Sequence, residues 1–105
     1  MIWYVEYSAE AYTDIAGIHQ YISDVLFAPD AAEKQFNRIM DAIDSLTRLP
    51  LRYRLYDKEP WRSRGLRVMP VDRYLIFYLP DEVRQIVYIV RIMYAGRNIE
   101  AGLAE

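Results

Sequence analysis

The stretch that decides the fold is LRVMPVDRYLIFYLPDEVRQIVYIVRIMY, residues 66–94. Three runs in it are rich in β-branched and aromatic residues: 66–71, 74–79 and 85–93. Connections of two and five residues separate these runs, and such short connections predict an antiparallel meander of three strands. The last run lacks polar alternation over residues 86–90, which indicates a central strand that is covered on both faces.

Two helices are expected upstream of the meander. The first is expected over residues 9–26, capped by Ser8, and Phe27-Ala28-Pro29 ends it. The second is expected to begin at Asp30, where Glu33 completes the spacing of a capping box, and to end at Pro50. Their apolar stripes have helical spacing: Ile15, Ile18, Ile22 and Val25 in the first, and Ala32, Phe36, Ile39, Met40, Ile43 and Leu46 in the second. The short connection predicts that the two helices form an antiparallel hairpin.

The order of elements predicts an α+β fold. Residues 2–7 are rich in β-formers and predict a first strand, whereas residues 51–64 have no periodicity and predict a structured loop or a short edge strand. Strand, helix, helix and a three-strand antiparallel meander would place the helix hairpin on one face of the sheet. With 105 residues and no linker-like segment, we expect one domain over residues 1–105.

Composition excludes several classes of chemistry. The absence of Cys removes disulfides, thiolate nucleophiles and zinc knuckles, and the four scattered glycines form no phosphate loop. His19, the single histidine, falls in mid-helix beside the apolar stripe, so we expect a packed or surface role for it. We therefore expect neither a metal nor a cofactor. The longest uncharged run, Ile15–Ser23, is too short for a membrane span, and residues 1–6 lack a secretory pattern, so we expect a cytoplasmic protein without a membrane partner.

Charge is segregated along the chain. Thirteen basic and fifteen acidic side chains give a net charge of −2, but residues 1–51 sum to −5 (3 − 8) and residues 52–105 sum to +3 (10 − 7). Arginine with tyrosine is a pairing that binds phosphate and stacks on bases. The candidate binding residues of the C-terminal half are Arg52, Arg54, Arg62, Arg64, Arg67, Arg73, Arg91, Tyr94 and Arg97. We expect their guanidinium groups to form one contiguous cationic surface for an acidic partner, the alternative being an ordinary solvated face.

Arg91 is the most informative of these residues, because it follows directly on the strand that is expected to be covered on both faces. A buried guanidinium needs a partner, so Arg91 either meets a carboxylate such as Asp72 or faces a groove that binds an anion. Tyr94 and Arg97 lie just beyond the strand end, where side chains are freer to face a ligand.

The whole arrangement resembles the RelE/ParE superfamily of toxins from type II toxin-antitoxin systems, also called plasmid stabilisation proteins. The resemblance covers residues 3–98. The motifs that carry it are Ser8-Ala9-Glu10-Ala11, Asp14-Ile15, Ile18-x-x-Tyr21-Ile22, Ala32 with Phe36, Leu46-x-x-Leu49-Pro50, Gly65-Leu66-Arg67, Tyr74–Tyr78 and Ile89–Asn98. The resemblance implies a toxin that arrests growth until a small antitoxin neutralises it. A groove between hairpin and sheet, apolar inside and rimmed with arginine, would suit an acidic antitoxin segment.

The resemblance leaves the target open. RelE-like members cleave mRNA on the ribosome, and in that case the catalytic candidates are Arg64, Arg67, Arg91 and Tyr94. ParE-like members inhibit DNA gyrase without bond chemistry of their own. The candidates for contacting the target are Arg52, Arg54, Arg62, Arg73 and Arg97. If the chain is RelE-like, the same residues are candidates for binding RNA. A third alternative is a non-toxic RNA-binding or protein-interaction domain that has kept the fold.

We favour gyrase for two reasons. The long, evenly matched helix hairpin resembles the ParE branch. The second reason is that the residues for mRNA cleavage are incomplete. The His or Glu of several mRNA-cleaving relatives has no assignable counterpart in residues 64–98, and Asn98 stands where the family usually has an acid. An ordinary tyrosine, with a pKa of about 10, is a poor general base at neutral pH.

Overall fold

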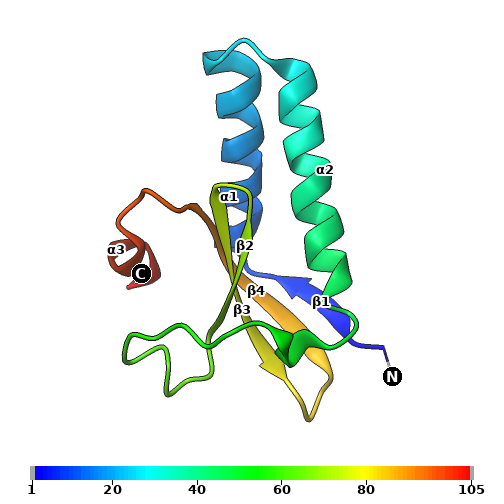
Figure 1. The fold of residues 1–105 in the computed structure, drawn as a ribbon, viewed down its shortest axis with the longest axis vertical. Helices are drawn as coiled ribbons and strands as arrows, with labels where there is room; N and C mark the ends of the chain where they lie inside the picture. Colours follow the sequence, from blue (N-terminus) through cyan, green and yellow to red (C-terminus); the bar gives the residue numbers. More distant parts are fainter. Residues whose placement is uncertain (1, 105) are drawn as a thin grey trace.

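The computed structural model describes residues 2–104 and has the α+β fold that the sequence predicts (Figure 1). In chain order its elements are β1 (Tyr4–Tyr7), α1 (Ala9–Gln20), the π-helical turn η1 (Tyr21–Val25), α2 (Pro29–Ser45), the 3-10 turn η2 (Pro50–Arg52), β2 (Arg67–Val71), β3 (Tyr74–Asp81), β4 (Ile86–Tyr94) and α3 (Ile99–Leu103). The strands begin and end within two residues of the predicted positions. Residues 53–66 form a loop, with one isolated bridge between Leu55 and Arg67.

The sheet has the strand order β1-β4-β3-β2, so β4 is a central strand. The predicted meander is confirmed: β2 and β3 pair antiparallel, as do β3 and β4, with a bulge between Phe77 and Tyr78. β1 pairs with β4 in parallel, a pairing made possible because the long hairpin of α1 and α2 carries the chain away before it returns.

The helix hairpin covers one face of the sheet, as predicted. Ala11 and Ile15 of α1 and Ile39 and Ile43 of α2 are buried there. Across from them lie the buried sheet residues Met69, Ile76, Tyr78, Val87, Ile89 and Ile92. The connection between the two helices lies well beyond the sheet, at one end of the molecule's long axis (Figure 1). The connection itself therefore lies outside the core.

The two helices begin differently. The predicted cap at Ser8 is confirmed: its buried Oγ accepts a hydrogen bond from the Ala11 amide at 2.9 Å and donates one to the Val90 carbonyl at 2.7 Å. The capping box predicted at Asp30 is wrong, because α2 begins one residue earlier, at Pro29, and no side chain caps it. Proline suits the first helical position, since its φ is already helical and that position needs no N–H donor.

The opposite face of the sheet carries a second, smaller core, which covers β4 at Val90 and Met93. The expected cover over both faces of residues 86–90 is only partial, because Tyr88 is 38% exposed and Ile86 is half-buried. The buried members of this second core are Tyr56, Leu66, Val68, Phe77 and Met93. Trp61 from the 53–66 loop covers one side of this core. Ile99 and Leu103 of α3, a helix that the sequence did not predict, cover another. Within residues 2–104, no helix combines the length and apolar character needed to cross a membrane.

Candidate functional site

An open groove of about 910 Å³ lies between the hairpin and the end of the sheet where β4 finishes. Ile18, Tyr21 and Ile22 line it from the hairpin side. The β2–β3 turn and the end of β4 line the other side with Arg73, Tyr74, Tyr94 and Arg97, among others. The groove therefore lies where one was expected, between hairpin and sheet, with arginine on its border.

Tyrosine rings form the aromatic part of the groove. The rings of Tyr74 and Tyr94 pack edge to face, with centroids 6.0 Å apart and an interplanar angle of 70°. Burial, together with the neighbouring hydroxyls of Tyr94 and Tyr21, raises the pKa of Tyr74 above its ordinary value. Tyr74 therefore keeps its proton at neutral pH and can donate a hydrogen bond, but it cannot serve as a proton acceptor there.

The two carboxylates that line the groove are both paired within the molecule. Asp72 pairs with Arg38 of α2 and also accepts a hydrogen bond from Gln35 Nε2 at 2.9 Å. Asp14 pairs with Arg91. By contrast, the exposed guanidinium groups of Arg73 and Arg97 make no hydrogen bond or ion pair with any side chain or carbonyl in residues 2–104. The charge that the groove can offer to a partner is consequently positive.

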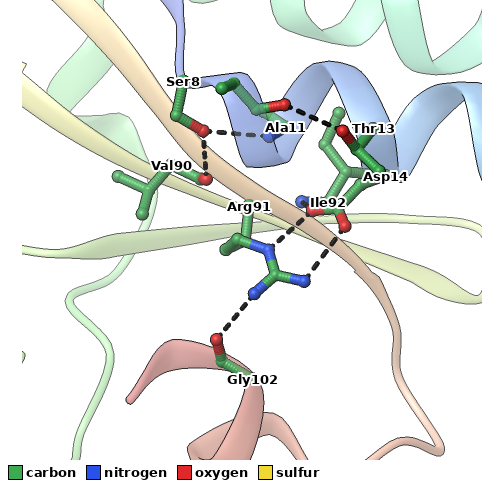
Figure 2. A network of polar contacts seen from close by, with 9 residues as sticks. Ser8, Ala11, Thr13, Asp14, Val90, Arg91, Ile92 and Gly102 are labelled. Atoms are coloured by element: carbon green, nitrogen blue, oxygen red, sulfur yellow. Dashed lines mark hydrogen bonds and ion pairs between the residues drawn. The ribbon is translucent and has the colours of Figure 1, made fainter. Parts of the chain in front are cut away.

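Arg91 is enclosed between α1, β4 and α3 (Figure 2). Its Nε donates to Asp14 Oδ2 at 2.8 Å and its Nη2 donates to Asp14 Oδ1 at 3.0 Å, a bidentate ion pair. Its Nη1 donates to the Gly102 carbonyl at 2.6 Å, and the Ile92 amide donates to Asp14 Oδ2 at 2.9 Å. The two side chains are only 10% and 9% exposed. Arg91 thus ties three elements together.

Of the two alternatives for Arg91, the structure therefore has the carboxylate partner. The expected example, Asp72, is the wrong residue, because Asp72 sits in the β2–β3 turn against α2 and is held there by Arg38. The partner is Asp14, 77 residues away in the sequence.

Three other candidate arginines bond to main-chain carbonyls around η2. Arg52 Nη1 donates to the Arg48 carbonyl at 2.7 Å, and its guanidinium carbon lies 4.9 Å from the centroid of the Tyr53 ring. Arg67 Nη1 donates to the Tyr53 carbonyl at 2.6 Å, and Arg54 bonds to the carbonyl of the next residue. Arg52 and Arg67 thus hold the chain between α2 and the loop, which is a structural role, whereas Arg54 is exposed and its bond of 3.4 Å joins no other segment.

The remaining candidates lie elsewhere. Arg64 is exposed and lines a separate pocket with Glu6 and Arg84, at the β3–β4 end of the sheet. Arg62 is exposed on the 53–66 loop.

The prediction of one contiguous cationic surface is therefore wrong. The structure gathers only Arg73, Tyr94 and Arg97 at the groove, and it spreads the other candidates over the loop, the core and the far end of the sheet. Successive residues of a strand point to opposite faces, so arginines that are near in sequence separate in space. The residues that would serve an mRNA-cleaving site, Arg64, Arg67, Arg91 and Tyr94, are not brought together.

Comparison with protein families decides the relationship. The model for "ParE toxin of type II toxin-antitoxin system, parDE" matches residues 5–99. The chain belongs to the ParE toxin family. No curated protein matches it by sequence. This ParE-family chain is thus a type II toxin of the RelE/ParE superfamily, as its motifs predict.

Solved structures agree with the fold of this ParE-family chain. A chain of the chromosomal ParDE toxin-antitoxin system from P. aeruginosa is similar with a TM-score of 0.71 and 18% identity, over 89% of this chain and 96% of that one. A chain of the RelBE2 toxin-antitoxin complex from Mycobacterium tuberculosis is similar with a TM-score of 0.65 and 18% identity, over 90% and 99%. At such identity the similarity shows the fold alone.

Proposed function

We propose that this ParE-family toxin inhibits DNA gyrase, and that a small acidic antitoxin neutralises it by placing an apolar segment with acidic side chains in the groove. The observation that carries the antitoxin part is the groove itself. Its floor is apolar and aromatic, its own acids Asp14 and Asp72 are already paired, and Arg73 and Arg97 stand exposed on its border. An amphipathic segment with carboxylates at its edge complements such a surface in both shape and charge.

Gyrase is favoured over mRNA cleavage on chemical grounds. Cleavage at a ribose hydroxyl needs a group that accepts a proton and cations that stabilise the developing charge. Arg91 is buried behind the groove and committed to Asp14, and Tyr74 in the groove keeps its proton at neutral pH. Inhibition by binding needs none of this chemistry. The family model that matches residues 5–99 is that of ParE toxins, and gyrase inhibition is what the resemblance implies for ParE-like members.

A charge-reversal experiment tests the antitoxin part. The toxin is co-expressed with the small acidic protein that we expect a neighbouring gene to encode. Arg97→Glu is compared with Arg84→Glu, the same charge change in the β3–β4 turn, away from the groove. We expect Arg97→Glu to weaken antitoxin binding about tenfold or more, equivalent to about 1.4 kcal/mol, and Arg84→Glu to leave it unchanged. Equal affinities for both variants, or a toxin that never co-purifies with that protein, would contradict the proposal.

Expression in growing cells tests the gyrase part. We expect growth arrest that co-expression of the antitoxin relieves, with double-strand breaks in plasmid DNA recovered from the arrested cells and with intact mRNA. Cleaved mRNA that appears only with translating ribosomes would instead support the RelE-like alternative. Normal growth would support the third alternative, a binding domain without toxicity.

A further inference from the structure

The tip of the helix hairpin, defined here as residues 20–28, exposes a cluster of large apolar side chains. Tyr21, Val25, Leu26 and Phe27 are all more than half exposed, and none belongs to either core. Figure 1 places this tip at the far end of the molecule from the sheet. These four side chains therefore contribute little to the stability of the fold by burial.

Phe27 is in a conformation that its side chain disfavours. The chain leaves the π-helical turn through a hydrogen bond from the Leu26 amide to the Tyr21 carbonyl and another from the Ala28 amide to the Ile22 carbonyl, both at 3.1 Å. Phe27, between these two amides, has φ of +53°, the left-handed region. This position after a helix is usually glycine, because a Cβ makes the left-handed conformation costly.

The side chain of Phe27 gains nothing in return within the described protein, since it is 87% exposed. An aromatic residue here breaks two local rules at once, one of turn chemistry and one of burial. Violations of local rules without a compensating gain in folding concentrate at functional sites. The presence of phenylalanine rather than glycine at this position therefore points to a contact outside the chain.

The charge around the tip indicates what kind of surface it contacts. Residues 1–33 contain no Lys or Arg. Asp24 and Asp30 are exposed beside the apolar cluster, and Glu33 makes a 3.3 Å contact with His19. The tip is thus apolar and anionic, whereas the border of the groove is cationic. An acidic partner complements the groove, and a basic partner complements the tip.

We infer that the hairpin tip is the surface that docks on the toxin's target, inserting Phe27 into an apolar pocket bordered by Lys or Arg side chains of that protein. The inference rests on the proposed function, in which the target is DNA gyrase. Tyr21 and Leu26 belong to the tip and also line the groove. An antitoxin bound in the groove would then obstruct target docking without any change of toxin conformation.

The test compares Phe27→Gly with Val83→Gly, using purified toxin, purified DNA gyrase and a supercoiling assay. Val83 is 95% exposed in the β3–β4 turn, so its replacement also removes an exposed apolar side chain, but at the other end of the molecule. We expect Phe27→Gly to melt at or above the wild-type temperature, since glycine fits the left-handed position, and to raise the half-inhibitory concentration at least tenfold. Val83→Gly should change neither value, and both variants should still bind antitoxin.

Inhibition by Phe27→Gly within twofold of wild type would overturn the inference while leaving the proposed function intact. If the wild-type toxin arrests growth but does not inhibit gyrase, the gyrase proposal fails separately. In that case growth arrest by the two variants tests the docking role of the tip. If Val83→Gly arrests growth and Phe27→Gly does not, the tip docks on another target. If both variants arrest growth, the docking inference is overturned. A wild-type chain with neither effect overturns both proposals. Replacing Asp24 and Asp30 together by lysine should also weaken inhibition, and an unchanged value would contradict a basic border to the pocket.

Discussion

Removal of one partner from the buried ion pair of Asp14 and Arg91 is expected to destabilise the fold strongly. The perturbation is Asp14→Asn, which keeps the shape of the side chain but removes the charge that two guanidinium N–H groups meet at 2.8 and 3.0 Å. Both side chains are about nine-tenths buried, so Arg91 would lose, in a site largely closed to water, the carboxylate that meets two of its N–H groups. Breaking one partner of such a pair costs about 3–5 kcal/mol, a large part of the roughly 5–15 kcal/mol available to a domain of this size.

Urea unfolding followed by circular dichroism measures this cost. We expect the midpoint to fall with little change of slope, and the melting temperature to fall by about 10 °C or more. The matched control is Asp72→Asn, which breaks an ion pair with Arg38 whose guanidinium side chain is 66% exposed, and it should cost no more than about 1 kcal/mol.

A double variant separates the pair from its surroundings. Asp14→Leu with Arg91→Met removes both charges and keeps apolar volume, so it should cost much less than the sum of the two single changes. Additive costs, or an Asp14→Asn cost near that of Asp72→Asn, would refute the view that Asp14 and Arg91 form a coupled buried pair.

Three further predictions concern the supports of the fold. Ser8→Ala should cost about 1–2 kcal/mol in urea unfolding, because it removes a helix cap together with a bond to β4. Burial raises the pKa of Tyr78 to about 12. Its protonated hydroxyl therefore contributes to the free energy of unfolding below pH 10, and this contribution is lost as the pH rises from about 10 to 12. In Tyr78→Phe, urea unfolding should show a smaller loss of stability over this pH range. Gly102→Ala would place a Cβ 2.6 Å from Met93 Sδ, so we expect faster amide hydrogen exchange in α3 and a cost of about 1–3 kcal/mol.

The main elements of the fold could be predicted because each has a local sequence pattern typical of a helix or a strand. The apolar stripes of the two helices and the β-rich runs of 66–94 are local patterns, and tertiary packing agrees with them. α3 has no such pattern, since it is a five-residue helix that contains Gly102. It depends on the packing of its own Ile99 and Leu103 against the second core and on the bond from Arg91 to the Gly102 carbonyl, and neither contact is visible in the local sequence.

Asn98 shows how a departure from a family pattern can preserve a local role. The resemblance leads one to expect an acid there, and its absence counted against mRNA cleavage. In the structure the Asn98 Oδ1 accepts a hydrogen bond from the Ala101 amide at 3.2 Å and caps α3. Asparagine caps a helix about as well as aspartate does, so the substitution costs the fold little.

The site could be predicted only in part, because partners of arginine come from anywhere in the fold. Tyr94 and Arg97 were expected to be free to face a ligand, and they do line the groove together with Arg73. Asp14 was missed as the partner of Arg91, although one signal was present. That signal is spacing: Asp14 lies three residues after Ala11 and four before Ile18, which places it on the inward face of α1. An acid on that face needs a buried partner.

The most direct test of the proposed function is to add one preparation of purified toxin to two assays in parallel, DNA supercoiling by gyrase and translation of a defined mRNA by ribosomes. We predict that supercoiling stops, with linear DNA released after denaturation of gyrase, and that the mRNA stays intact. Unimpaired supercoiling together with mRNA cut only in the presence of ribosomes would contradict it.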